Sequence, residues 1–379
     1  MIPAQGLRIR SLLQPTGQLE LSLVEEPVPQ PAADEVVIRV QAAPINPSDL
    51  GQLFAAADLG SLRQSGTAAR PELTATVSPT VVEALAARIG RPMGAGNEGA
   101  GEVVAAGTSA AAQALLGRTV ASFAGEMYAQ FRCVPVAQCV ALPADVTPAQ
   151  GASCFVNPMT VLGIVETART EGHTALVHTA AASNLGQMLN RVCVEDRLDL
   201  VNVVRGDDQE RLLRAQGARF VCNSSAPSFD RTLATAIEAT NATIAFDAVG
   251  GGVLADRILA AMESVQSRKA SGYSLYGTST RKQLYIYGAL DTGPTILRRN
   301  YGAAWNIGAW LLPQFMQRAG SETIARMQRR VMDGLLTTFA SRYIQEISLA
   351  CALQVDEIAR YAQRSTNGKV LINPQQPID

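Results

Sequence analysis

The chain has 379 residues, of which 47% are hydrophobic and 17% are charged, and its formal net charge at pH 7 is −1. This composition excludes a disordered chain, and the near-zero charge gives no electrostatic footprint for nucleic acid or an anionic membrane. The length predicts two domains. Six widely spaced cysteines, the absence of a basic-then-apolar leader and the absence of an apolar spanning run predict a soluble, cytoplasmic protein without a membrane segment.

The first part of the chain, up to residue 146, shows short β-like runs. Strands are predicted at residues 7–12, 19–24, 35–40 and 102–106, with further short strands between residues 117 and 142. Ser48 and Asp49 follow two prolines and are expected to cap a helix. The alanine-rich segment 55–92 is interpreted as an insertion that carries an amphipathic helix at 79–89. We therefore expect a β domain here.

Repeated strand–helix units begin at Thr147. A helix is predicted at 149–170, then a strand at 175–177, a helix at 186–194, a strand at 200–204, a helix at 207–216, and strands at 220–222, 244–248 and 283–288. With right-handed crossovers this alternation predicts a doubly wound parallel sheet. Residues 298–319 are predicted to form an apolar helix. The tail, with helices at 322–336 and 355–363 and strands at 343–347 and 369–372, is expected to return to the N-terminal β domain.

The stretch from Ala175 to Gly186 has the pattern of a phosphate-binding turn. A short apolar strand leads through small residues to Gly186, where helix-like apolar spacing begins. In a dinucleotide-binding loop, three glycines let the backbone approach a pyrophosphate at a helix N-terminus. Only the last glycine is present here, and Ala180 and Ser183 take the earlier places. The turn alone fits both a phosphate loop and ordinary packing.

Seven motifs stand in sequential order: Ala-Pro-Ile-Asn-Pro-Ser-Asp-Leu (43–50), Gly-Asn-Glu-Gly-Ala-Gly (96–101), Tyr-Ala-Gln-Phe (128–131), Asn-Pro-Met-Thr (157–160), the 180–186 turn, Phe-Asp-Ala-Val-Gly-Gly (246–251) and Gly-Lys-Val-Leu (368–371). This series resembles the medium-chain dehydrogenase/reductase superfamily, in particular its zinc-free NADPH:quinone oxidoreductase-like branch. The resemblance implies an α/β fold in which a Rossmann doubly wound parallel sheet domain (150–320) is inserted in a GroES-like β-barrel catalytic domain (1–149 and 321–379). It also implies that substrate and nicotinamide bind between the two domains.

The residues offer no set of thiolates and imidazoles for zinc, so we predict no metal. Where zinc-dependent relatives carry a cysteine and a histidine, this chain has Asn46 and Asn97, and its two histidines, His173 and His178, are expected to be structural. Zinc enzymes use the ion to form an alkoxide from which hydride can leave. Without the ion, we expect hydride transfer from NADPH to a substrate that is already electrophilic, such as a quinone, an enone or an enoyl thioester.

Four residues are candidate catalytic residues: Asn46, Tyr128, Asn157 and Thr160. The Asn46 amide and the Tyr128 phenol could donate to a substrate carbonyl; alternatively, the amide satisfies its own turn and the ring packs at a strand edge. The resemblance implies that Asn157 and Thr160 begin a helix near the nicotinamide, although Asn157 could also cap that helix. No dyad or triad pattern identifies a general acid, so proton delivery from water stays open.

The end of the second Rossmann strand favours NADPH over NADH, because the Arg205 guanidinium matches a 2′-phosphate. Asp207 and Asp208 count against this unless they are first-turn helix residues. Related quinone reductases often carry a lysine where this chain has Gln209, so Arg205 or Arg211 would have to compensate. The predicted cofactor-binding residues are Thr160, Ala181, Ala182, Ser183, Asn184, Leu185, Gly186, Arg205, Val249, Gly250, Gly288, Ala289 and Leu290.

Two other functions stay open at this point. One is a 2-enoyl thioester (enoyl-CoA/ACP) reductase, whose catalytic tyrosine would correspond to Ala57 in this chain. The other is a nucleotide-binding protein without significant catalysis. A small-molecule substrate and a homodimer are expected, the dimer through the exposed edge of the last predicted Rossmann strand near Leu284–Tyr287, with Trp305 or Trp310 nearby. The sequence does not decide whether the 55–92 insertion covers the cleft.

Overall fold

The computed structural model describes residues 3–362 and 368–377, and the chain divides into two compact units. The first unit comprises Met1–Val156 and Ala340–Asp379, and the second comprises Asn157–Phe339. The divisions thus follow residues 156 and 339, whereas we expected them after residues 149 and 320. Residues 321–339 lie in the second unit because helix α10 (Leu312–Asp333) is bonded to it, with Arg330 Nη2 2.7 Å from Asp196 Oδ1.

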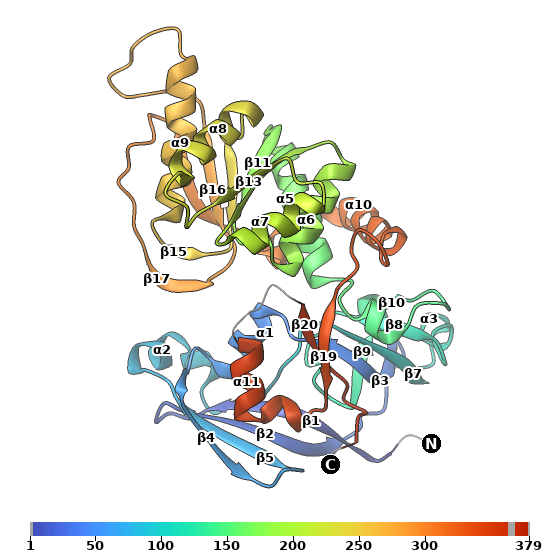
Figure 1. Ribbon diagram of the computed structural model, residues 1–379. Helices are drawn as coiled ribbons and strands as arrows, with labels where there is room; N and C mark the ends of the chain where they lie inside the picture. Colours follow the sequence, from blue (N-terminus) through green and yellow to red (C-terminus); the bar gives the residue numbers. More distant parts are fainter. Residues whose placement is uncertain (1–2, 363–367, 378–379) are drawn as a thin grey trace. The chain divides into compact units, whose positions relative to one another are not determined.

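The first unit is built from two open sheets and short helices (Figure 1). Its strands are β1 (Gln5–Leu13), β2 (Gln18–Pro27), β3 (Glu35–Pro44), β4 (Asp58–Gly66), β5 (Pro71–Thr76), β6 (Met93–Gly94), β7 (Gly99–Ala106), β8 (Thr119–Ser122), β9 (Phe131–Pro135), β10 (Cys139–Ala141), β19 (Tyr343–Ile347) and β20 (Lys369–Ile372). Its helices are α1 (Pro47–Phe54), α2 (Pro79–Ala84), α3 (Ala110–Gln113), α4 (Pro148–Gly151) and α11 (Val355–Ala362). Gln363, the expected last residue of that final helix, lies outside the described residues.

The strand orders are β4-β5-β2-β1-β6 in one sheet and β10-β8-β7-β3-β20-β19 in the other, where β9 also pairs with β3. The tail returns to the N-terminal strands as predicted, since β20 runs antiparallel to β3 with Leu371 opposite Pro44. Alternate residues of β1 and β2 are buried in the common core. The closed barrel implied by the resemblance does not appear among the strand pairs of the described residues.

The 55–92 segment differs from the expectation, because it adds strands β4 and β5 to the first sheet. Leu62, Leu73 and Ala75 are buried in the core there, which a run rich in alanine and small polar residues did not reveal. The helix expected at 79–89 is interrupted at Leu85, whose φ of −103° and ψ of 22° separate α2 from a short 3-10 helix, Ala86–Arg88.

The second unit contains a six-stranded parallel sheet in the order β13-β12-β11-β14-β16-β18. Its strands are β11 (Ala175–His178), β12 (Asp199–Val204), β13 (Phe220–Asn223), β14 (Ile244–Asp247), β16 (Lys282–Ile286) and β18 (Trp305–Ala309). Its helices are α5 (Val156–Thr170, whose first residue belongs to the first unit), α6 (Asn184–Glu195), α7 (Asp207–Ala215), α8 (Phe229–Thr240), α9 (Leu254–Lys269) and α10. Counted along the chain the order is 3-2-1-4-5-6, which is the Rossmann order, and it reverses between β11 and β14. The expected doubly wound parallel sheet is confirmed.

Two of the helices expected from the sequence differ in the structure. The expected helix at 149–170 is two helices, α4 and α5, and the expected helix at 298–319 contains strand β18 before α10 begins. Because β18 pairs in parallel with β16, with Ile307 opposite Leu284, the predicted edge at Leu284–Tyr287 is wrong. β18 is a partly exposed strand of five residues, which is too short for periodicity to separate it from a helix.

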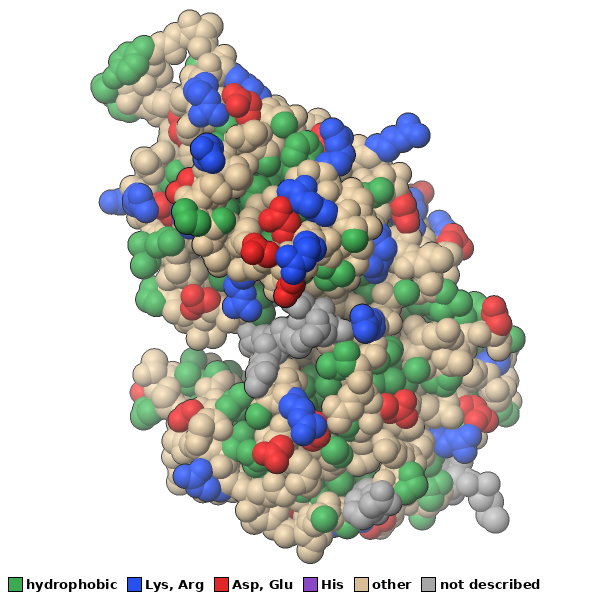
Figure 2. Space-filling view, in the orientation of Figure 1, with side chains coloured by type: hydrophobic (Ala, Val, Ile, Leu, Met, Phe, Trp, Pro, Cys, Tyr) green, Lys and Arg blue, Asp and Glu red, His purple; other side chains and the backbone are tan. Residues whose placement is uncertain are grey.

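Charged side chains of both signs are interspersed on the face shown in Figure 2, in keeping with the net charge of −1. Hydrophobic side chains gather at the end of the loop between α9 and β16, where Tyr273 and Tyr276 are 92% and 77% exposed. None of the helices in the described part of the chain is long and apolar enough to cross a membrane.

Candidate functional site

The turn between β11 and α6 has the backbone of a glycine-rich loop, although it has one glycine. Ala180 has a φ of 50°, in the left-handed region that usually requires glycine. Ser183 precedes α6, and its Oγ accepts a hydrogen bond from Gly186 N at 3.1 Å. A Cβ on Gly186 would lie 2.2 Å from the Ala181 carbonyl oxygen, so no larger residue fits there. The remaining glycine is thus the one that the packing requires.

Asp247, the last residue of β14, ties the neighbouring loop to this turn. Its Oδ1 accepts from Thr179 Oγ1 at 2.6 Å and from Val249 N at 2.9 Å, and its Oδ2 accepts from Gly250 N at 3.2 Å. Thr179 Oγ1 in turn accepts from Ala248 N at 2.8 Å. The predicted cofactor residues Val249 and Gly250 therefore lie at the switch point beside the β11–α6 turn, where open α/β sheets bind ligands.

The loop after β16 meets the same end of the sheet. Leu290 N donates to Ala248 O at 3.2 Å, and Asp291 N donates to Val249 O at 2.9 Å. A Cβ on Gly288 would lie 2.5 Å from the Ala248 oxygen, which explains the glycine. Short strands β15 (Gly250–Gly252) and β17 (Asp291–Thr295) continue this pairing. The loop that follows β14 therefore lies beside three predicted cofactor-binding residues, Gly288, Ala289 and Leu290.

Arg205 follows β12 and is exposed. Its backbone N–H donates to Gln209 Oε1 at 2.9 Å, and its carbonyl accepts from Ser225 Oγ at 2.9 Å. These contacts fix the backbone at the end of the second Rossmann strand. Gln209 is thereby turned back onto this backbone.

The two nearby acids are bonded elsewhere. Asp207 and Asp208 are first-turn residues of α7, one of the two alternatives left by the sequence. Asp207 Oδ1 accepts from Asn223 Nδ2 at 2.8 Å, and Asp208 pairs with Arg211. Arg211 is therefore engaged, and Arg205 is the guanidinium that remains at this strand end.

The polar cluster of the first unit surrounds Asn46. Its Nδ2 donates to Glu98 Oε1 at 3.0 Å, and its Oδ1 accepts from Lys369 Nζ at 2.7 Å. Glu98 Oε2 also accepts from the backbone N–H groups of Phe155 at 3.0 Å and Val156 at 2.8 Å. Asn46 and Glu98 are each 1% exposed. The Asn46 side chain thus binds two buried charged groups, contacts that were not expected from the sequence.

Asn46, and not Ser48 or Asp49 as was expected, holds the N-cap position of α1; Asp49 is the third residue of the helix, and its side chain completes a capping box with Asn46. Asp49 Oδ2 accepts from Asn46 N at 2.7 Å, and Oδ1 accepts from Asn97 N at 2.8 Å and Asn97 Nδ2 at 2.6 Å. Burial raises the pKa of Asp49 to about 6, against the opposing effect of these hydrogen bonds. Asn97 is thus bound to the α1 helix.

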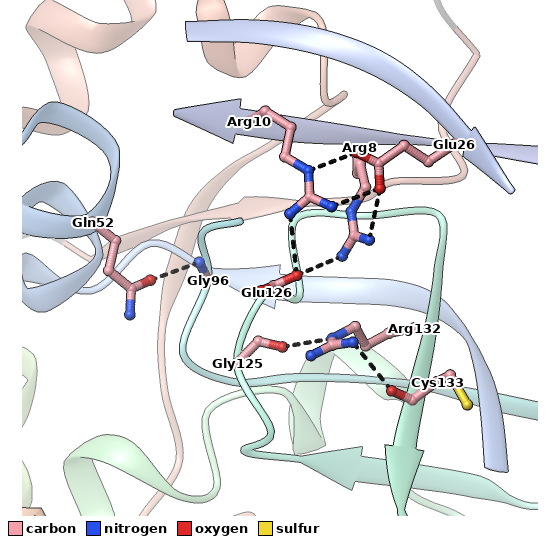
Figure 3. Close-up of polar contacts among 9 residues, drawn as sticks. All are labelled: Arg8, Arg10, Glu26, Gln52, Gly96, Gly125, Glu126, Arg132 and Cys133. Carbon is pink, nitrogen blue, oxygen red and sulfur yellow. Dashed lines mark hydrogen bonds and ion pairs between the residues drawn. The ribbon is translucent and has the colours of Figure 1, made fainter. Parts of the chain in front are cut away.

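The turn that carries Tyr128 is held by an ion network on β1 and β2 (Figure 3). Arg8 Nη2 lies 2.8 Å from Glu126 Oε2, and Arg10 Nη2 lies 2.6 Å from Glu26 Oε2. Glu126 itself has a φ of 57°. The network therefore fixes a strained residue two positions before Tyr128.

Tyr128 is fully buried, and its hydroxyl donates to the Pro44 carbonyl at 3.1 Å. Burial raises the pKa of Tyr128 above its usual range. The hydroxyl therefore holds the end of β3 within the first unit. Asn157 and Thr160 belong to the second unit; because α5 begins at Val156, Asn157 lies inside the first turn and does not cap the helix.

The histidines lie inside the second unit. His178 is fully buried, burial lowers its pKa to about 3, and its Nε2 is 2.7 Å from the Tyr287 hydroxyl. His173 Nδ1 is 2.7 Å from Thr243 Oγ1. Within residues 3–362 and 368–377, no three His, Cys, Asp or Glu side chains are grouped so that they could hold a metal ion.

Several solved structures share this fold. A structure from Mesorhizobium loti, provisionally assigned as an NADPH:quinone reductase, is 27% identical with a TM-score of 0.71, covering 99% of this chain and 100% of that one. A mycobacterial protein in complex with NADPH is 19% identical, with a TM-score of 0.67 over 97% and 100% of the two chains. The Etr1p complex with NADP and crotonyl-CoA is 16% identical, with a TM-score of 0.67 over 98% and 100%.

The chain has the fold of the medium-chain dehydrogenase/reductase superfamily. This confirms the resemblance read from the seven motifs. No protein-family profile and no curated protein sequence matches the chain significantly.

Sequence reasoning missed four residues of the cluster around Asn46 in this medium-chain dehydrogenase/reductase fold: Glu98, Ser153, Tyr343 and Lys369. Glu98 and Lys369 stand inside two of the recognised motifs, as charged residues next to glycines and apolar residues. A charge in a run that otherwise forms a core strand is a signal of a buried, paired group. Ser153 and Tyr343 carry no such signal, since only the fold brings them together.

Proposed function

We propose that the chain is an NADPH-dependent oxidoreductase that transfers hydride to a quinone or another conjugated carbonyl. The observation that carries the cofactor preference is Arg205 at the end of β12, with Asp207 and Asp208 both bonded elsewhere. An NAD site keeps an acid at this place for the ribose hydroxyls, whereas a guanidinium fits a 2′-phosphate. The Mesorhizobium loti structure and the NADPH and NADP complexes support the same cofactor.

The residues at the switch point fit a dinucleotide. The left-handed Ala180 and the sterically required Gly186 keep side chains away from the helix N-terminus, so the backbone of residues 181–186 can approach a pyrophosphate. The loops that contain Val249–Gly250 and Gly288–Leu290 would border the rest of the cofactor, as would Thr160. When bound, the reduced nicotinamide supplies the hydride.

The described residues of the first unit supply polar groups and include no cluster of side chains that could hold a metal ion. We propose that Asn46, fixed between Lys369 and Glu98, marks the carbonyl side of the substrate site. Donors placed before the reaction stabilise the negative charge that develops on the carbonyl oxygen during hydride addition. A substrate activated by conjugation needs no further Lewis acid, and quinones and enones meet that condition.

An acceptor screen tests this proposal. Purified protein is mixed with NADPH and, separately, with a benzoquinone, a cyclic enone and crotonyl-CoA, and the loss of reduced nicotinamide is followed by absorbance. We expect turnover with the quinone or the enone. Binding of NADPH without turnover of any acceptor would contradict the proposal and favour a nucleotide-binding protein without catalysis.

The enoyl thioester reductase is the second candidate, because the Etr1p complex with NADP and crotonyl-CoA shares the fold. Against it, Ala57 stands where that branch is expected to carry a catalytic tyrosine. Ala57 follows α1, packs against the core of the first unit, and has no hydroxyl to offer. Turnover of crotonyl-CoA faster than the quinone and the enone would make this candidate the better one.

A further inference from the structure

Three polar side chains of the first unit form a hydrogen-bonded chain that ends at a phenol. Lys369 Nζ donates to Ser153 Oγ at 3.3 Å, and Ser153 Oγ lies 2.7 Å from the Tyr343 hydroxyl. Lys369 begins β20, Tyr343 begins β19, and Ser153 follows α4. The parallel pairing of β19 and β20 places Tyr343 opposite Lys369. The Lys369 ammonium and the Tyr343 hydroxyl therefore both reach Ser153 Oγ.

The three hydrogen-bonded residues differ in burial. Ser153 is 2% exposed and Lys369 is 7% exposed, whereas Tyr343 is only partly buried. Tyr343 is therefore the most exposed of the three residues and forms the outer end of the hydrogen-bonded series. The ammonium is the inner end, where Lys369 Nζ also donates to Asn46 Oδ1 at 2.7 Å.

The inner cation has an unusual setting. Within the described part of the chain, no carboxylate lies within ion-pair distance of Lys369 Nζ, although Glu98 and Asp49 act on it from further away. A buried cation that lacks a direct counter-ion is costly for the fold. Burial lowers the pKa of Lys369, so its ammonium releases a proton more readily than an exposed lysine. Burial raises the pKa of Tyr343, so the phenol is protonated at neutral pH.

We propose that Lys369, Ser153 and Tyr343 form a proton relay that delivers a proton to the reduced substrate, with Tyr343 as the donor. The relay rests on the proposed function, because hydride addition to a conjugated carbonyl leaves an enolate that must be protonated. The Tyr343 O–H bond breaks as its proton moves to the enolate, and the Ser153 hydroxyl proton moves to the phenolate oxygen. Lys369 then gives an N–H proton to the Ser153 oxygen, and the neutral amine regains a proton from water.

Asn46 has a defined place in this arrangement. Its Oδ1 holds the Lys369 ammonium, while its Nδ2 is bound to Glu98. An amide does not pass protons on readily, so Asn46 closes the inner end of the relay. Lys369 and Ser153 are positioning and relay residues, and Tyr343 is the group that touches the substrate.

The test compares Tyr343→Phe and Ser153→Ala with the wild type, using NADPH and the best enone. We expect Tyr343→Phe to lower kcat about 100-fold, the usual size of a general-acid contribution, with the KM for NADPH changed less than about twofold. The solvent deuterium isotope effect on kcat should rise in both variants, because protonation becomes rate-limiting. Small buffer acids should partly restore the rate of Tyr343→Phe, which a purely structural loss would not allow.

Tyr361→Phe is the matched control, since its hydroxyl bonds to the Ala352 carbonyl in the same unit and has no contact with the relay. It should keep the wild-type kcat and isotope effect. An unchanged kcat and solvent isotope effect in Tyr343→Phe would overturn the relay. If Tyr343→Phe does not fold by circular dichroism, the same readouts on Ser153→Ala decide. A wild type that turns over no acceptor refutes the proposed function and the relay with it, whereas an active wild type with unaffected variants refutes the relay alone.

Discussion

Lys369 Nζ donates to Asn46 Oδ1 across 2.7 Å, although the two residues are 323 positions apart in the chain. Because the amide oxygen faces the ammonium, the amide nitrogen faces Glu98. The resemblance implies a zinc-ligating cysteine at this position in zinc-dependent relatives. Here the ammonium group of Lys369, on strand β20, lies beside the same position.

Asp49 should make stability depend on pH between about 4 and 6. Its pKa is raised from 3.8 to about 6 in the folded chain, so the native state binds the proton more tightly than the unfolded state does. Stability is therefore greatest below the unfolded pKa, and about 3 kcal/mol is lost as pH rises through this window. Urea denaturation at several pH values, in wild type and Asp49→Asn, measures the contribution.

The difference between the two proteins is the informative quantity, because other carboxylates titrate in both. Asp49→Asn should be the more weakened of the two at pH 4, and its disadvantage should shrink by up to about 3 kcal/mol by pH 7. A difference that stays constant across this range would contradict the raised pKa.

Gly186→Ala should abolish tight NADPH binding. Its Cβ would lie 2.2 Å from the Ala181 carbonyl oxygen, so the turn before α6 must move. We expect at least a tenfold rise in the Kd for NADPH in a fluorescence titration and a loss of about 1–3 kcal/mol of stability, as for other overpacked sites. Gly51→Ala is the control, because nothing lies within 4 Å of its Cβ position, and it should stabilise α1 slightly.

Arg205→Glu should raise the KM for NADPH much more than the KM for NADH. The substitution replaces the guanidinium with a negative charge that repels a 2′-phosphate, whereas ribose hydroxyls can donate hydrogen bonds to a carboxylate. Steady-state rates with both cofactors measure the ratio, and we expect it to change by at least tenfold. Arg211→Glu, at a residue already paired with Asp208, should change the ratio less. Equal effects of Arg205→Glu on both cofactors would remove Arg205 from the cofactor site.

Lys282→Met should destabilise the second unit strongly. Lys282 Nζ is fully buried 2.8 Å from Glu263 Oε2, and its loss leaves a buried carboxylate without its cation. A loss of about 3–5 kcal/mol is expected in urea denaturation, and replacing Glu263 with Leu as well should recover part of it. Arg214→Met, which breaks an exposed pair with Glu210, should cost less than about 1 kcal/mol.

We propose a homodimer that forms through strand β18. Within the described part of the chain β18 pairs with β16 alone, so its other edge offers backbone groups to a second copy. Light scattering of the wild type should give twice the mass of one chain. Ile307→Lys places a charge on this half-buried edge and should give the monomer mass. A monomeric wild type would contradict the proposal.

The parts of the fold that were predicted from sequence have local signals. The strand–turn–helix at Ala175–Gly186 and the successive strand–helix units follow from periodicity and small residues, and the structure places them in Rossmann order. The strand at Trp305–Ala309 was missed because its signal is that of any apolar run. Strands β4 and β5 were missed because they contain Asp, Gly, Pro and Glu, which have weak strand preference.

A role in the candidate site could be predicted from the sequence only for a residue whose chemistry and position in the chain suggest that role without knowledge of its neighbours. Arg205, at the end of a strand, suggests a 2′-phosphate site by itself. In the structure the nearby Asp207 and Asp208 are bonded to other residues. The partners of Asn46 suggest no role by themselves, because Glu98 and Lys369 become neighbours only through strand pairing over most of the chain. Nor could the sequence show that Tyr128 uses its hydroxyl on Pro44.

The pairing of β3 with β20 has a consequence for biosynthesis. Strand β3 is translated before its neighbour β20, and the whole second unit lies between them in the sequence. The Rossmann sheet, encoded without interruption, can assemble in the meantime. Until β20 has been synthesised, Ala43 and Pro44 at the end of β3 lack this strand partner, and that edge is open to non-native pairing.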